Sequence, residues 1–447
     1  MATADRDPRR ELERLVELAC DEARKRGAQQ ARARGSSSQS TKVVIRDGKQ
    51  EEVKAAASRG LSLEVYVDGR YGKHETSILE PAELEAFIGR AVAMTRVLMP
   101  DPHRFLPAPK HYTGRSTAEL GIYDADHARV TTDRRQQRAM AAHDAAHEAA
   151  GKQVISVSGG ASDRQGLSVL RATNGFADSQ HSSSFWVWAE VSIKDPSGRR
   201  PNDWAEAGAR KHDRLPDPRE VGRQAAQRTL AIVGADKIAS LTVPLIIENR
   251  AVGRLLGGLL APLSGWALDQ KRSCFEKSLG QGIASPGLSI IDDPLLPGGW
   301  GSRRFDGEGL TARRRPLLDK GVLRTFFVDA YYARKLEREP TSGGASNLVF
   351  APGSEDLEAL CRRAGRAIVI SDFLGGNSNS TTGDFSHGIR GFLVEDGKRK
   401  RPIASMNIAG NHQTFWKTLQ AVGNDPYPHG SHRTPSLLFA PTVVAGK

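Results

Sequence analysis

Two histidines one helical turn apart are the residues whose types and spacing most directly suggest chemistry. His143 and His147 are four positions apart, and Asp144 follows the first of them. In a helix both imidazoles would share one face, as in HExxH zinc helices, with Asp in place of the usual Glu base. Asp is a methylene group shorter than Glu, and no third ligand stands nearby. The Ala-, Arg- and Gln-rich surroundings predict an ordinary exposed helix, with metal binding as the alternative.

The C-terminal part of the chain supplies two further groups of candidate residues. Residues 375–391, GGNSNSTTGDFSHGIRG, join two apolar segments, and their small side chains allow the backbone to approach another segment closely. Three more imidazoles, those of His412, His429 and His432, follow in stretches without an acidic partner. We expect these loop histidines to be solvated, with a metal site at His429 and His432 as the weaker interpretation.

Residues 241–281 contain the most apolar helix that the sequence predicts. The run 243–247 has the length of a buried strand, and the leucines after it recur at helical spacing. Gly257 and Gly258 lie within that helix, where each glycine costs about 1 kcal/mol relative to alanine. Pro262 should kink or end the helix. The glycine pair therefore indicates either tight helix packing or a site beside a partner or ligand.

These candidate residues must be positioned by two differently built halves of the chain. Turn dipeptides at Asp47-Gly48 and Asp68-Gly69 predict two hairpins. Residues 29–41, rich first in Ala and Arg and then in Ser, are predicted to form a flexible loop. The second half is rich in Gly, Pro and short apolar runs and is predicted to be mostly β, interrupted by helical segments near 330–338 and 353–364. Amphipathic helices are predicted over 11–26 and 81–99, and two further helices over 126–152 and 215–233.

The resulting prediction is an α/β (α+β) fold with two domains. The character of the chain changes near 235–240, which predicts an N-terminal helix-and-sheet domain over 1–235 and a C-terminal β-rich domain over 236–447. A length of 447 residues is enough for two ordinary domains.

The composition is that of a globular protein in a reducing compartment. The three cysteines are far apart, which argues against a disulfide framework or a cysteine zinc site. The N-terminus is charged, and no run reaches the roughly 18 apolar residues of a membrane span. We therefore expect a soluble cytoplasmic protein without membrane contact. The net charge of +12 would attract anions, but the basic residues are spread along the chain, so we do not expect nucleic acid as the partner.

The chain resembles the TldD/PmbA family, the modulator of DNA gyrase and microcin-processing metalloprotease family, and most closely its PmbA (TldE) branch. The resemblance is carried by residues 241–281, by the TGDFS segment 382–386, and by the landmarks Ala409-Gly410-Asn411 and Gly423-Asn424-Asp425. In the TldD branch the helix after this strand carries a metal-binding HExxxH. Its first histidine, its glutamate and its second histidine fall here on Gly257, Gly258 and Pro262, none of which has a side chain that can bind a metal. The cysteine ligand near the C-terminus of that branch is also absent, since the last cysteine here is Cys361.

The resemblance implies a supporting role in a cytoplasmic zinc peptidase that cleaves unfolded polypeptides or peptides. A TldD-like catalytic subunit would hold the zinc, and this chain would join it as a heterodimer, or form a homodimer, without a cofactor or catalytic residues of its own. The resemblance implies that the peptide channel or subunit contact would include Gly257, Gly258, Thr382, Gly383, Asp384, Phe385 and Ser386. A structural turn, in which Asp384 binds local amides, is the alternative for the last five.

Two other functions stay open at this level. One is an independent hydrolase with an atypical metal site at His143 and His147. The other is a basic nucleic-acid-binding or interaction protein.

Overall fold

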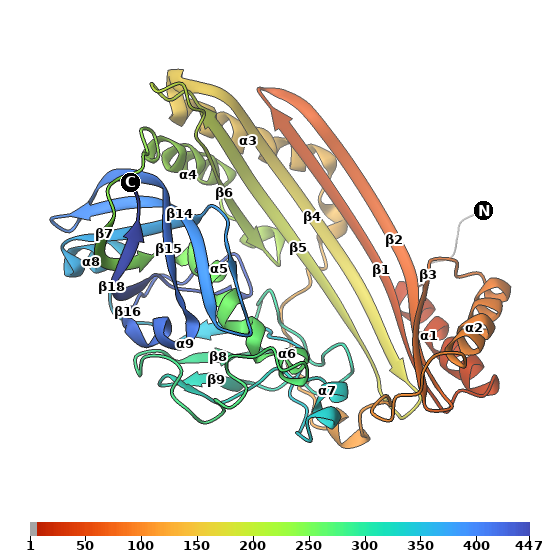
Figure 1. The fold of residues 1–447 in the computed structure, drawn as a ribbon. Coiled ribbons are helices and arrows are strands. Elements are labelled where there is room, and N and C mark those ends of the chain that lie inside the picture. Colours follow the sequence, from red (N-terminus) through yellow and green to blue (C-terminus); the bar gives the residue numbers. More distant parts are fainter. Residues whose placement is uncertain (1–6) are drawn as a thin grey trace.

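The computed structural model describes residues 7–447 and shows a mixed α+β fold (Figure 1). Its strands assemble into one sheet of long strands from the first half of the chain and two sheets of shorter strands from the second. The predicted fold class is confirmed. Within residues 7–447, no helix combines the length and apolarity that crossing a membrane requires.

The first half of the chain builds a six-stranded antiparallel sheet in the order β3-β2-β1-β4-β5-β6. Asp47 and Gly48 join the first two strands, and Asp68 and Gly69 join the next two. All four residues have positive φ, as tight hairpin turns require, and both predicted hairpins are confirmed. The strands are β1 (Gln30–Arg46), β2 (Lys49–Val67), β3 (Arg70–Thr76), β4 (Val154–Ala172), β5 (Ala177–Ile193) and β6 (Asn202–Ala209).

The predicted flexible loop over 29–41 is wrong, because nearly all of it belongs to strand β1. This segment is hydrogen-bonded on both sides, with Ser36 opposite Gly60 of β2 and Ser168 of β4. Small polar side chains carry little strand propensity of their own. Here the two neighbouring strands satisfy the backbone, so the side chains are free to be polar.

Helices cover one face of this sheet, and their positions agree with the prediction. Leu12 and Val16 of α1 pack against Gly35 of β1. The third helix was predicted to be exposed, but one of its faces is buried against β1, β4 and β5, including Ala139 and His143. The helices are α1 (Pro8–Lys25), α2 (Pro81–Thr95), α3 (Thr132–Ala150) and α4 (Pro218–Ala231).

The second half of the chain is built around a closed ring of five strands. The order is β12-β7-β18-β15-β14, and pairing between β14 and β12 closes the ring. The ring strands are β7 (Leu241–Ile247), β12 (Ala367–Phe373), β14 (Asp384–Glu395), β15 (Lys398–Asn411) and β18 (Leu437–Ala445), with β13 (Asn377–Ser378) and β16 (Leu419–Val422) attached.

A smaller sheet and five helices complete this half of the chain. The sheet order is β10-β9-β8-β11-β17, from β8 (Ile290–Asp292), β9 (Arg315–Asp319), β10 (Val322–Leu323), β11 (Leu348–Phe350) and β17 (His432–Arg433). The helices are α5 (Asn249–Leu260), α6 (Gly265–Asp269), α7 (Ala330–Lys335), α8 (Leu357–Ala364) and α9 (His412–Phe415), of which α7 and α8 are the predicted helical interruptions.

The sheets fall on either side of the predicted boundary between residues 235 and 236. Every strand of the long sheet ends by Ala209, and the strands of the other two sheets begin at Leu241. The two halves nevertheless meet, since Phe305 belongs to the same apolar cluster as Tyr66 and Phe176. The division into domains 1–235 and 236–447 stays a prediction that this arrangement supports.

Candidate functional site

Helix α5 starts directly after the buried strand β7, and only the first glycine of its pair, Gly257, is exposed. Ala251, Leu255 and Leu259 are buried, as the leucine spacing predicts. The helix ends at Leu260, and a short 3-10 turn containing Pro262 follows, as expected for proline.

The two glycines of α5 have different surroundings. Gly257 is exposed, and a Cβ atom added there would meet no other atom within 4 Å. A Cβ atom on Gly258 would overlap Nε2 of His412 and lie 2.7 Å from Oγ of Ser378. Tight packing therefore explains Gly258, while Gly257 leaves the helix surface open.

The two residues that face Gly258, His412 and Ser378, belong to a chain of four hydrogen bonds. The Trp416 indole N–H donates to Nδ1 of His412 at 3.0 Å. An indole N–H can only donate, so the proton of the neutral His412 ring is on Nε2. From there it is donated to Oγ of Ser378 at 3.1 Å.

The same chain of hydrogen bonds continues to a second histidine. The Ser378 hydroxyl is left to donate to Nε2 of His387 at 3.4 Å, and Nδ1 of His387 donates to the Gly375 carbonyl at 3.3 Å. Both histidines are only 1% exposed. The prediction that His412 is a solvated loop histidine is therefore wrong, because its ring is buried, packs on Phe385 and accepts a hydrogen bond from Trp416.

These residues do not fit a zinc ion. A histidine ligates zinc through an unprotonated nitrogen, and in His412 the Nδ1 lone pair accepts from Trp416 while Nε2 carries the proton. Gly257, Gly258 and Pro262 offer no ligand atoms in their side chains. Across residues 7–447, no three His, Cys, Asp or Glu side chains are grouped so that they could hold a metal ion. Burial, with a smaller contribution from His387, lowers the pKa of His412 to about 4.

The segment 382–386 lies against the same site. Gly383, at φ 84°, accepts the His412 backbone N–H through its carbonyl, and Phe385 packs on the His412 ring at 4.9 Å between centroids. The Asn411 side-chain amide donates to Oδ1 of Asp384 and to the Thr382 carbonyl. The structure thus brings Gly258 and this segment together around His412.

The exposed residues of the two predicted segments are Gly257, Thr382, Asp384 and Ser386, whereas Gly383 and Phe385 are buried. Hydrogen bonds from Thr382 and, to a smaller extent, from Asn411 hold the pKa of the Asp384 carboxyl below its usual range. The amide that Asp384 binds is the side chain of Asn411, 27 residues later in the chain, so a turn held by local amides stays a prediction. Because Thr382, Asp384 and Ser386 are exposed, their side chains are also free to contact a partner subunit or a peptide.

The other predicted pair, His143 and His147, has a structural setting. Nε2 of His143 accepts the Gly48 backbone N–H at 3.0 Å, and Nδ1 lies 2.9 Å from Oδ1 of Asp144. His143 is buried, while His147 is exposed. Both ring nitrogens of His143 therefore have partners, and the ring anchors the turn between β1 and β2.

Gly257 serves as a matched control for a prediction about Gly258. We expect Gly258→Ala to lower the free energy of unfolding by about 1–3 kcal/mol, because His412 is enclosed and cannot move away. Gly257→Ala should raise it by up to about 1 kcal/mol through helix propensity alone. Urea unfolding of both variants measures the difference, and equal stability of the two would contradict the packing described here.

The comparisons with known proteins point to one family of metallopeptidases. The model of the PmbA/TldA metallopeptidase C-terminal domain matches residues 240–446, and that of domain 1 of the same proteins matches 31–95. Metalloprotease PmbA of Escherichia coli O157:H7 is 28% identical over 412 residues, covering 91% of this chain and 90% of the relative. A PmbA homolog of Haemophilus influenzae is also 28% identical and covers 98% and 96%.

Two solved structures show the same fold over nearly the whole chain. A candidate modulator of DNA gyrase from Bacteroides thetaiotaomicron superposes with a TM-score of 0.94 at 36% identity, covering 97% of this chain and 99% of that one. TldE from Thermococcus kodakarensis superposes with a TM-score of 0.85 at 21% identity, covering 98% and 100%.

Proposed function

The chain belongs to the PmbA/TldD metallopeptidase family, and we propose that it is a supporting, non-catalytic subunit of a zinc peptidase that cleaves unfolded polypeptides or peptides. In this proposal a TldD-like subunit in the cytoplasm holds the zinc and performs the hydrolysis. This chain binds that subunit and completes the chamber in which the polypeptide is held.

The observation that carries the proposal is the His412 site beside α5. Gly257 and Gly258 stand where the resemblance places metal-binding side chains, and Gly258 is packed against a histidine whose Nε2 proton is directed at Ser378. The hydrogen bond from the Trp416 indole to Nδ1 fixes the orientation of the buried His412 ring. The residues at this place support packing rather than metal chemistry.

The surface beside this site is our candidate for contact with the partner subunit or with the polypeptide. Gly257 leaves the surface of α5 flat, and Thr382, Asp384 and Ser386 offer hydroxyl and carboxylate groups at the surface. Gly383 and Phe385 lie beneath and hold these groups in place. The contact would be a homodimer surface if the partner is a second copy of the chain.

Metal content and peptidase activity test the proposal. We expect the purified chain to be metal-free and inactive alone, and a mixture with the TldD-like protein of the same organism to cleave an unfolded polypeptide faster than either component. A His143→Ala/His147→Ala variant should behave like the unaltered chain in the mixture. Stoichiometric zinc and peptidase activity in the chain alone, lost in that variant, would show an independent hydrolase instead.

A further inference from the structure

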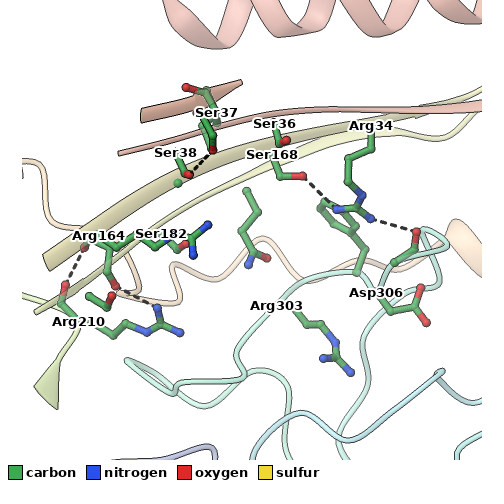
Figure 2. A pocket seen from close by; sticks show the side chains of 18 residues that line it. Arg34, Ser36, Ser37, Ser38, Arg164, Ser168, Ser182, Arg210, Arg303 and Asp306 are labelled. Carbon is green, nitrogen blue, oxygen red and sulfur yellow. Dashed lines mark hydrogen bonds between the residues drawn. The ribbon is translucent and has the colours of Figure 1, made fainter. Parts of the chain in front are cut away.

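One unexplained feature of the surface is a cleft of about 470 Å³ between the long sheet and a loop of the second half of the chain. Figure 2 shows its two sides, with serines on the strands and Arg303 and Asp306 on the loop opposite. Strands β1, β4 and β5 form its floor.

Strand alternation explains which residues line the floor. Gly35 faces Leu12 and Val16 of α1, so its neighbours Arg34 and Ser36 point to the opposite face of the sheet. This is the face that the helices leave uncovered.

The strand register aligns small polar side chains across the floor. Ser36 of β1 lies opposite Ser168 of β4, which lies opposite Gln180 of β5. One step along, Ser38 and Ser182 flank Gly166 in the same way. The floor is therefore a shallow field of hydroxyl and amide groups, each able to donate and accept hydrogen bonds.

Positive charge dominates the lining, with Arg34, Arg164, Arg210 and Arg303 against the single carboxylate of Asp306. Within the described chain, the partners of these guanidinium groups are oxygens of carbonyls and hydroxyls rather than carboxylates. Arg34 donates to Ser168 Oγ and the Gly307 carbonyl, and Arg210 donates to the Ser183 carbonyl.

Burial affects the pKa of two of these guanidinium groups, and for Arg34 the charges of Glu64 and Asp306 offset it only in part. Desolvation lowers the pKa of Arg34, with a smaller effect from Arg32, and lowers the pKa of Arg210 to about 10. Nε of Arg210 is buried without a hydrogen-bond partner in the described chain. A carboxylate brought into the cleft would supply the missing counter-charge.

The cleft continues into a second hollow of about 630 Å³, which shares Arg34, Ser36 and Gly307 with the first. Glu64 in this second part is already paired with Arg32 at 2.6 Å. Together the two hollows cross from β5 to β3 and offer a path for an elongated ligand.

We propose that this cleft binds an extended acidic polypeptide. Arg34 and Arg164 would pair with its carboxylates, Arg210 and Arg303 would add positive potential, and the serine hydroxyls would bind its backbone. The central strands of the floor, β1 and β4, are already paired on both sides, so the polypeptide would be held there by side chains and not added to the sheet as a further strand. The inference rests on the proposed function and specifies its substrate class.

The lining favours a polypeptide over a nucleic acid. Proteins that bind single strands stack the bases on exposed aromatic rings. The lining contains one ring among the described residues, that of Phe305, and it is only 6% exposed. Carboxylates and backbone amides match the arginine and serine groups without stacking.

Fluorescence anisotropy of the full chain with labelled peptides tests the proposal. We expect a Glu-rich unstructured peptide to bind about tenfold or more tightly than its Gln counterpart at low salt, and the preference to shrink as salt screens the charges. The Arg34→Gln/Arg164→Gln variant should lose that preference. The matched control is Arg14→Gln/Arg90→Gln, which removes two exposed arginines of α1 and α2 and should keep the preference within about twofold.

Several results would overturn the cleft proposal. Equal binding of both peptides, or no binding of either, would do so, as would equal losses in the cleft and control variants. If the chain binds a single-stranded oligonucleotide more tightly than the Glu-rich peptide, and this binding depends on Arg34 and Arg164, the ligand of the cleft is a nucleic acid and not a polypeptide. Circular dichroism and urea unfolding of each variant establish that it is folded.

The outcome is separable from the proposed subunit role, since binding is measured without a partner. If the chain selects the Glu-rich peptide but does not support cleavage in the mixture, the cleft proposal is supported and the proposed subunit role is contradicted. If the mixture cleaves Gln-rich and Glu-rich polypeptides equally well and the chain alone binds both peptides equally, the subunit role is supported and the cleft proposal is contradicted.

Discussion

Asp203→Asn is expected to lower the free energy of unfolding by about 3–5 kcal/mol, because it removes the buried carboxylate that two largely buried arginines share. Oδ2 of Asp203, on β6, lies 3.0 Å from Nη2 of Arg250 on α5 and 3.4 Å from Nη2 of Arg390 on β14. The three side chains are 2%, 11% and 14% exposed. The carboxylate therefore ties the long sheet to the closed ring. Neutralising it leaves Arg250 with Glu248 at 3.7 Å and Arg390 with Asp372 at 2.9 Å, and removes the only group that the two guanidinium groups share among these ion pairs.

An exposed ion pair provides the control. Asp319 and Arg324 are 3.1 Å apart with side chains 48% and 46% exposed, so Asp319→Asn should change the free energy of unfolding by about 0–1 kcal/mol. Urea unfolding followed by tryptophan fluorescence compares the two variants. If the link between the halves is lost, the Asp203 variant should also show two separate transitions. A loss as small as that of the Asp319 variant would contradict the structural role of the cluster.

The second large effect is a loss of stability in acid that originates at His412. Its pKa in the folded protein is about 4, and its ordinary value is 6.5. Between these values the unfolded chain binds a proton that the native ring does not. Stability from this site is therefore complete above about pH 6.5 and falls as the pH drops towards 4, by about 1.4 kcal/mol per pH unit and about 3 kcal/mol in all.

Comparison of two histidine variants isolates this contribution. We expect His412→Gln to flatten the dependence of the unfolding free energy on pH between 6.5 and 4, whatever its effect at neutral pH. His147→Gln replaces an exposed histidine of α3 and should retain the slope of the unaltered chain. If the two variants have the same slope, the acid sensitivity arises elsewhere.

Much of the local structure could be predicted from the residues. The leucine spacing of α5 and the proline after it determine a helix that ends at Leu260, and the two Asp-Gly dipeptides determine the first hairpins. These features depend on interactions within a few residues of each other. The α+β class follows from the same local patterns.

The candidate site could be predicted only in part. The TGDFS segment and the glycine pair were recognisable, but nothing local showed that Gly258 faces His412, more than 150 residues later in the chain. The signal that could have indicated it was Trp416, four residues after His412, which places a ring donor one helical turn away. Its significance depends on the burial of both rings.

The sequence by itself determined the helices, the tight turns, the family resemblance and the lack of metal-binding side chains on α5. The tertiary structure decided what the serine-rich stretch 30–41 became and what it faces. Its small polar side chains have no strong local preference, and pairing with β2 and β4 made it a central strand. The same pairing aligned its hydroxyls with those of β4 and β5 in a cleft that four arginines line. Such an arrangement depends on register between distant segments, which local patterns do not specify.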